Sequence, residues 1–147
     1  MYLLDTNIVS RLDPRRRAGA PGLVTWIDRN GAHLFLSALT FMELEAGILK
    51  LRREGKRERA DALTVLARAI LDDFGTRVLA VDASVALEAA RLAEVARPVT
   101  LDAADLLIVG TAKAHGLTVL TNNLRHFTLT GVPALDPLAS LPPDMPP

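Results

Sequence analysis

Three acidic residues in this chain stand among apolar neighbours, where solvation does not account for them: Asp5, Glu43 and Asp105. Asp5 directly follows the apolar run at positions 2–4, and Asp105 precedes the run LLIVG. No Arg or Lys lies one helical turn from Asp105 to pair with it. An isolated buried carboxylate is energetically costly, so buried acids are normally paired or coordinate a metal ion.

These carboxylates would repel one another at a shared site unless a cation lay between them. Hard oxygen ligands suit Mg²⁺ or Mn²⁺, which commonly bind phosphate-bearing substrates. Such an ion activates water and stabilises the charge of a phosphodiester during cleavage. The three acids therefore indicate a candidate metal-dependent hydrolytic site.

Helix capping is the alternative interpretation of the same residues. Asp5 is placed to be the N-cap of a helix that starts at Asn7. Glu43 completes a capping box with Thr40, in which Glu reaches back to the N-cap amide. Asp102 is expected to cap the next acidic helix, with Asp105 completing an Asp-x-x-Asp variant of the box. Capping and metal ligation are compatible, so both interpretations stay open.

Short apolar runs alternate with longer helical patterns along the chain. Strands are expected at 2–4, 33–36, 77–81, 118–120 and 132–135. Helices are expected at 7–12, 22–30, 40–53, 58–74, 84–96 and 102–115. The segment DPRRRAGAPG at 13–22 is expected to be a loop, Pro98 to end a helix, and Gly116 to act as a C-cap.

This alternation predicts a single compact α/β domain with a short, mainly parallel central sheet flanked by helices. Ligands of such sheets lie at the carboxyl ends of the strands, and Asp5 occupies that edge. The domain is expected to span residues 1–138. Residues 139–147 form a proline-rich C-terminal tail that we expect to fray.

Composition excludes several classes of protein. The 147 residues suit one domain, and half of them are apolar, which excludes disorder. There are no cysteines, so disulfides, thiolate catalysis and cysteine zinc sites are excluded, and the three histidines argue against a zinc hydrolase. The apolar runs are too short to span a membrane, and no signal-peptide pattern opens the chain. We therefore expect a cytoplasmic protein with no membrane partner.

The formal net charge is zero, from 17 basic and 17 acidic residues, so attraction for a polyanion must come from local patches. Two runs, RRR and KLRREGKRER, are candidates, although a solvated helix face and a loop explain either run alone. The candidate phosphate-binding residues are Arg15, Arg16, Arg17, Lys50, Arg52, Arg53, Lys56 and Arg57.

Three segments in order, LLDTN, LTFMELEAG and DLLIVGTAKAHGLTVLTNN, resemble the PIN domain. The best match is the VapC-type toxin branch of bacterial toxin–antitoxin pairs, from Met1 to about Leu138. The resemblance implies a compact α/β/α fold and a Mg²⁺- or Mn²⁺-dependent endoribonuclease. Its acidic positions match the three carboxylates named above. Thr6 and Asn7 match residues beside the first acid, which shape the turn or hold a water, and Thr121 matches a hydroxyl residue near the last acid.

One position departs from the pattern of the family. Its members often carry a fourth acid at the position of Asn123, or an Asp at the position of His126. Asn123 can offer a carbonyl oxygen or orient a water. His126 can bind a softer metal, donate a proton, contact RNA, or be an ordinary surface histidine. Three carboxylates thus predict one firm metal site and leave a second ion open.

The resemblance also implies partners. The substrate would be an RNA of the tRNA or rRNA class. A small cognate antitoxin would block the acidic groove with its C-terminal segment, often through an Arg or Lys. Homodimers and toxin–antitoxin hetero-oligomers are expected.

Other functions remain as alternatives. A non-catalytic PIN-like module would bind RNA or a protein without cleaving. A haloacid-dehalogenase-type phosphatase is set aside, because it needs a second Asp at position 7, where this chain has Asn. A response-regulator receiver would have to use Asp82, after RVLAV, as its phospho-acceptor.

Overall fold

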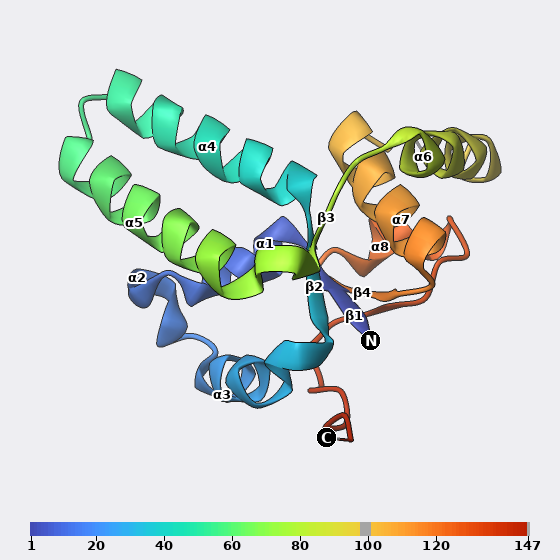
Figure 1. Ribbon diagram of the computed structural model, residues 1–147, viewed down its shortest axis with the longest axis horizontal. Coiled ribbons are helices and arrows are strands. Elements are labelled where there is room, and N and C mark those ends of the chain that lie inside the picture. Colours follow the sequence, from blue (N-terminus) through green and yellow to red (C-terminus); the bar gives the residue numbers. More distant parts are fainter. Residues whose placement is uncertain (98–100, 147) are drawn as a thin grey trace.

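A computed structural model describes residues 1–97 and 101–146, apart from the side chain of Arg17 (Figure 1). The elements in chain order are β1 (Tyr2–Leu4), α1 (Thr6–Val9), η1 (Ser10–Leu12), α2 (Pro14–Arg17), α3 (Pro21–Asn30), η2 (Gly31–His33), β2 (Leu34–Ser37), α4 (Ala38–Arg53), α5 (Arg57–Phe74), η3 (Gly75–Arg77), β3 (Val78–Leu79), α6 (Ala83–Val95), α7 (Ala103–His115), β4 (Thr118–Leu120), α8 (Leu124–Thr128) and β5 (Ala134–Leu135). Within the two described ranges, no helix has the length and apolar character needed to cross a membrane.

The central sheet has five strands in the order β3-β2-β1-β4-β5, and each neighbouring pair is parallel. The chain moves outward from β1 to β2 and β3, then crosses to the other side of β1 to add β4 and β5. Strand order therefore reverses between β1 and β4. Ligands of open α/β sheets bind at the carboxyl ends of the strands beside such a reversal.

The central strands β1 and β4 contribute side chains to a core on each face of the sheet. Tyr2 and Leu4 belong to the core that α1, α3 and α5 cover, whereas Leu3 points into the core covered by α6, α7 and α8. Val119 and Leu120 of β4 divide in the same way. Figure 1 shows these two groups of helices on opposite sides of the strands. The predicted α/β/α architecture with a parallel sheet is confirmed.

Two short helices were not predicted from the sequence: α2 lies in the expected loop at 13–22, and α8 lies in a segment for which no element was predicted. α2 begins after Asp13, whose Oδ1 accepts a hydrogen bond from the backbone N–H of Arg15 at 3.0 Å. Asp at the N-cap followed by Pro at the first helical position is a favourable helix start, so interpreting Pro14 as a loop signal was wrong. α8 was not expected, because five residues are too few to show a helical period.

Several boundaries differ by one to a few residues. The 3₁₀ turns η2 and η3 take up the first residues of the expected strands 33–36 and 77–81, so β2 and β3 begin later. The fifth strand exists but is confined to Ala134–Leu135. α4 begins at Ala38, two residues before the expected start. Pro98, expected to end the helix at 84–96, lies outside the described residues.

The C-terminal tail contacts α3, which contradicts the expectation that it frays. Asn30 is 2% exposed, and its amide nitrogen donates to Asp144 Oδ1 at 2.9 Å. Its amide oxygen accepts from the backbone N–H of Met145 at 2.8 Å. A buried amide needs hydrogen-bond partners, and the tail supplies them.

α7, which carries Asp105, packs closely on α6 through Gly110. A Cβ added at Gly110 would lie 2.8 Å from the backbone oxygen of Val85 and 3.0 Å from Ala89 Cβ. The first distance is shorter than real Cβ contacts and the second is tighter than most of them, so glycine sets how closely the two helices approach. The position of α7 relative to the sheet therefore depends on this residue.

Gly110→Ala should lower the free energy of unfolding by about 1–3 kcal/mol, because the new methyl group must push α7 away from α6. Urea denaturation measures the change. Gly47→Ala is the matched control, since its added Cβ meets no described atom within 4 Å. The control should be neutral or more stable by up to about 1 kcal/mol. Equal stability of Gly110→Ala and the unmodified chain would contradict the close packing.

Candidate active site

The three acids lie on three different elements at the carboxyl edge of the sheet. Asp5 follows β1, Glu43 lies near the start of α4, and Asp105 lies in the first turn of α7. Burial raises the pKa of Asp5 above its ordinary value of 3.8, and the nearby charges of Asp105 and Glu43 raise it further. Hydrogen bonds from Thr121 and the backbone of Thr6 offset part of this rise. The sheet thus brings Asp105 and Glu43 close enough for their charges to act on Asp5.

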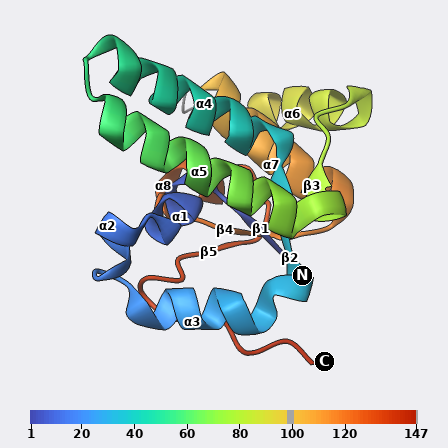
Figure 2. The same ribbon diagram turned by 60° about the vertical axis from the view of Figure 1, so that its left-hand side comes forward.

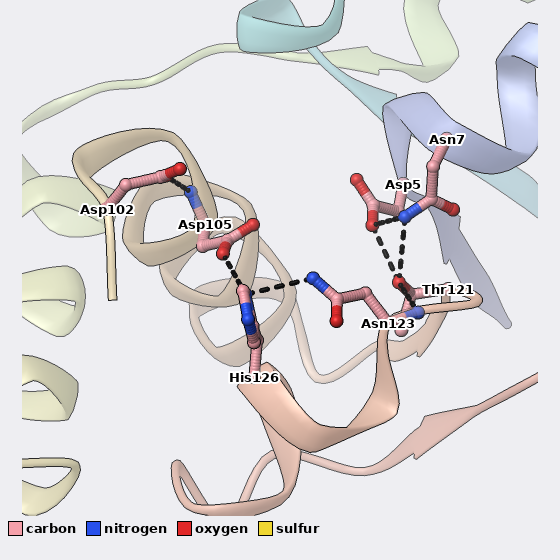
Figure 3. A network of polar contacts seen from close by, with 7 residues as sticks. All are labelled: Asp5, Asn7, Asp102, Asp105, Thr121, Asn123 and His126. Carbon is pink, nitrogen blue, oxygen red and sulfur yellow. Dashed lines mark hydrogen bonds and ion pairs between the residues drawn. The ribbon is translucent and has the colours of Figure 1, made fainter. Parts of the chain in front are cut away.

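Asp5 is held by side chains rather than acting as a cap. It occupies the N-cap position of α1 by backbone conformation, but its side chain makes no capping hydrogen bond. Instead Asp5 Oδ2 accepts from Thr121 Oγ1 at 2.7 Å and from Asn7 Nδ2 at 2.5 Å (Figure 3). Asp5 is 7% exposed, so these donors replace the water that a surface carboxylate would have.

Thr121 organises the edge between β1 and β4. Its hydroxyl is fully buried, donates to Asp5, and accepts from Asn7 Nδ2 at 3.1 Å and from the backbone N–H of Asn123 at 3.0 Å. The oxygen of Asn7 accepts from the backbone N–H of Asn122 at 3.3 Å. One hydroxyl donor and two acceptor positions are all that a threonine offers, so its hydrogen bonding is complete.

Glu43 is not part of a capping box, so that interpretation was wrong. The N-cap of α4 is Ser37, whose hydroxyl accepts from the backbone N–H of Leu39 at 3.3 Å. Thr40 therefore lies inside the helix. Glu43 Oε2 instead accepts from Thr6 Oγ1 at 2.5 Å, and Thr6 also lies 3.4 Å from Thr40 Oγ1. Nothing in the sequence indicated that Thr40 would contact Thr6, because only the fold brings these two side chains together.

The side chain of Asp105 likewise does not cap its helix. Asp102 is the N-cap of α7, as predicted, and its Oδ1 accepts from the backbone N–H of Asp105 at 2.7 Å. The carboxylate of Asp105 does not complete the expected Asp-x-x-Asp box. Its Oδ2 lies 2.8 Å from His126 Nδ1, and Asn123 Nδ2 lies 2.9 Å from the same nitrogen (Figure 3). The partner of Asp105 is therefore a histidine of α8.

The donor set suits a hard divalent cation. Within residues 1–97 and 101–146, no three His, Asp or Glu side chains are grouped closely enough to ligate one ion together. Mg²⁺ does not require such a cage, because it keeps several waters and is usually held by one or two carboxylates. A cation would also relieve the repulsion from Asp105 and Glu43, which adds to the effect of burial in raising the pKa of Asp5. By chemistry, Asp5, Asp105 and Glu43 fit Mg²⁺ or Mn²⁺.

The two basic runs meet on one surface, which we call the basic ridge: α2 and the turn between α4 and α5, residues 14–17 and 50–59. Arg15 lies 4.0 Å from Glu58, and Arg59 lies 3.7 Å from Asp13, so α2 is joined to the start of α5. Figure 2 shows the α4–α5 pair extending beyond the strands, with α2 below α5. With a rise of about 1.5 Å per residue, the end of α4 lies roughly 15 Å from Glu43.

Some cations of the ridge are already paired. Arg52 lies 3.7 Å from Asp61, Lys56 lies 2.7 Å from Glu54, and Arg16 donates to Ser10 Oγ at 3.1 Å. These exposed pairs are weak and exchange readily with other anions. Lys50, Arg53 and Arg57 are exposed. The side chain of Arg17 lies outside the described part of the structure.

Asp5→Asn should raise the free energy of unfolding at neutral pH when no divalent ion is present. The folded chain binds the Asp5 proton more tightly than the unfolded chain, because its pKa is raised. The charged carboxylate therefore costs stability above that raised pKa, and the cost fades as the pH falls through it towards 3.8. Denaturant unfolding in EDTA at several pH values measures the difference.

Asp28→Asn, an exposed position on α3, is the matched control and should change stability little at any of these pH values. A destabilised Asp5→Asn variant at neutral pH would contradict the electrostatic cost assigned to Asp5.

Comparison with known proteins identifies the family. The family model described as "PIN domain" matches residues 2–131. The chain is 34% identical over 140 residues to Toxin FitB of Neisseria gonorrhoeae, covering 93% of this chain and 98% of the relative. It is 32% identical over 143 residues to the VapC ribonuclease Y4jK of Sinorhizobium fredii, covering 93% and 97%. The crystal structure of FitAcB from Neisseria gonorrhoeae is 32% identical with a TM-score of 0.77, covering 93% of this chain and 98% of that one. The chain therefore belongs to the PIN domain family.

Proposed function

We propose that this protein is a metal-dependent endoribonuclease that acts as the toxin of a toxin–antitoxin pair. The observation that carries the proposal is that three carboxylates lie at the sheet edge where strand order reverses, and that burial, with the nearby charges of Asp105 and Glu43 adding to it, raises the pKa of Asp5. Two relatives are named for these activities, one as a toxin and one as a VapC ribonuclease.

The three acids would have two roles in this proposal. Asp5 and Asp105 would hold Mg²⁺ or Mn²⁺, and Glu43 would hold the ion or its water and serve as general base. When bound, the ion supplies Lewis-acid chemistry, which activates water and stabilises the phosphate charge. The remaining residues keep the acids in place: Thr6 donates to Glu43, and Asn7 and Thr121 donate to Asp5. Asn123 orients a water in the same region.

Asp5→Asn, Asp105→Asn and Glu43→Gln should each abolish or strongly reduce cleavage of structured RNA that depends on Mg²⁺ or Mn²⁺. Loss of the general base alone is expected to cost on the order of 10²–10⁴-fold. Cleavage rates of purified variants, with and without EDTA, measure the effect.

Glu45→Gln is the matched control for Glu43→Gln, because Glu45 lies on the same helix but is exposed to solvent. It should cleave at the rate of the unmodified chain. Equal cleavage by the unmodified chain and all three site variants would assign the activity to a contaminant and reject the proposal.

The basic ridge would bind the phosphates of the substrate, which we propose to be an RNA of the tRNA or rRNA class. The helix α4 carries Glu43 near its start and Lys50, Arg52 and Arg53 of the ridge at its end, so one RNA can contact both regions. Because basic side chains release counterions from RNA, affinity should fall steeply as salt increases.

Arg53→Gln and Arg57→Gln should each weaken RNA binding uniformly across sequences. Each change should reduce the slope of log affinity against log salt by about 0.7–0.9. Fluorescence anisotropy in EDTA measures binding without cleavage. Arg97→Gln, an exposed position just after α6, is the control and should leave the slope unchanged. Binding that does not respond to salt would remove the ridge from the RNA path.

An antitoxin is the second partner in this proposal. Its C-terminal segment would enter the acidic groove and place an Arg or Lys between the carboxylates, where it offsets their repulsion as a cation does. Homodimers, toxin–antitoxin hetero-oligomers and action in the cytoplasm belong to the same proposal.

A non-catalytic PIN-like module that binds RNA or a protein is the second candidate function. The observation in its favour is that residues 123 and 126, where the resemblance to the family implies an acid, are Asn and His. The cleavage experiment separates the two, because a binding module retains RNA but does not cut it with either metal.

A further inference from the structure

The segment after β4 contacts two of the three acids at once. At its start, Thr121 Oγ1 donates to Asp5 Oδ2 at 2.7 Å. Asn123 follows and donates its backbone N–H to the same hydroxyl at 3.0 Å. At its end, His126 Nδ1 lies 2.8 Å from Asp105 Oδ2. Figure 3 shows this path from Asp5 to Asp105. The segment therefore fixes two carboxylates that belong to different elements.

The chemistry of His126 decides which of its contacts forms. A carboxylate only accepts hydrogen bonds, and an amide nitrogen only donates them. His126 Nδ1 can donate its hydrogen to Asp105, or it can accept from Asn123 Nδ2 without that hydrogen, but it cannot do both. A hydrogen bond to a carboxylate is the stronger of the two, and the Asp105 side chain is only 20% exposed. The geometry therefore places a hydrogen on Nδ1.

We propose that His126 is a positioning residue that holds Asp105 for a single divalent ion. This inference rests on the proposed metal-dependent function. The Nδ1–H bond commits Asp105 Oδ2 to the histidine and fixes the orientation of the carboxylate. An acid at position 126 would add a fourth carboxylate to the site, whereas an imidazole adds none. Affinity for divalent cations rises with the number of ligand charges. A histidine instead of an acid at position 126 therefore favours binding of one ion over two.

Mn²⁺ binding to the full chain without RNA tests the proposal, with calorimetry giving affinity and stoichiometry. The unmodified chain should bind one ion. His126→Phe removes the donor and should weaken Mn²⁺ binding by about tenfold or more, as loss of a ligand-orienting partner typically does. His126→Asn keeps an N–H near the place of Nδ1 and should restore the affinity to within about threefold. His126→Asp should bind a second ion.

His115→Phe is the matched control, because His115 is an exposed histidine in the last turn of the same helix as Asp105. It should bind Mn²⁺ as the unmodified chain does. Unchanged affinity in folded His126→Phe would overturn the positioning role. A single ion in His126→Asp would overturn the limit on stoichiometry, and the NMR measurement below judges the positioning contact if His126→Phe does not fold.

A second measurement separates failure of this inference from failure of the proposed function. In the metal-free chain, ¹⁵N NMR at a pH where the ring is neutral should show the His126 hydrogen on Nδ1. Asp105→Asn should reduce that preference. If the unmodified chain binds no divalent ion, the proposed function fails, and the NMR result alone judges the His126–Asp105 contact. A hydrogen on Nε2 would overturn it.

Discussion

The site depends on placing one charged carboxylate, Asp5, almost out of reach of water. Burial and two neighbouring acids oppose its charge, which raises its pKa. The buried carboxylate of Asp5 is stabilised by hydrogen bonds from Thr121 and Asn7, and the parallel pairing of β1 with β4 brings it to these donors. The backbone N–H of Asp5 donates to the backbone oxygen of Leu120 at 3.0 Å. Asp5 therefore takes part both in the pairing of β1 with β4 and in the site. Register errors between these strands would separate the carboxylate from its donors.

The other two acids reach this edge through packing on opposite sides of the sheet. Glu43 is carried by α4, which continues directly from β2. Asp105 is carried by α7, whose distance from α6 is set by Gly110. The sheet and its two cores therefore bring like charges together, and their repulsion lowers the stability of the fold when no cation is bound. Functional sites commonly contain such local conflicts, which the rest of the fold must offset.

Polar residues around the acids do more than fill space. Thr6, Thr121 and His126 each contact one of the three carboxylates, so every acid has an oriented partner from another element. Orientation of ligands by neighbouring hydrogen bonds is as important to a metal site as the ligands themselves. The basic ridge is linked to the site by α4. In the proposed function, this helix would set the spacing between the phosphates of the RNA and the acids.

The sequence by itself determined the fold class and which three acids are candidate site residues, because both depend on local patterns. Apolar runs, helical periods and cap residues are properties of neighbouring positions, and an acid at the end of an apolar strand is visible without any fold. Asp102 as an N-cap was correctly predicted for the same reason. Short elements such as α2 and α8 were missed, since they are too brief to show a period.

Only the tertiary structure decided which partner each acid has. Glu43 is bonded to a residue 37 positions away, Asp5 to one 116 positions away, and Asp105 to one 21 positions away. These pairings follow from strand order and helix packing, which no local pattern encodes. The capping interpretation of Glu43 was wrong because Ser37, not Thr40, caps α4, and that of Asp105 was wrong because its carboxylate contacts His126. The physical reason is that a hydrogen bond between distant residues forms only after the core has placed them together.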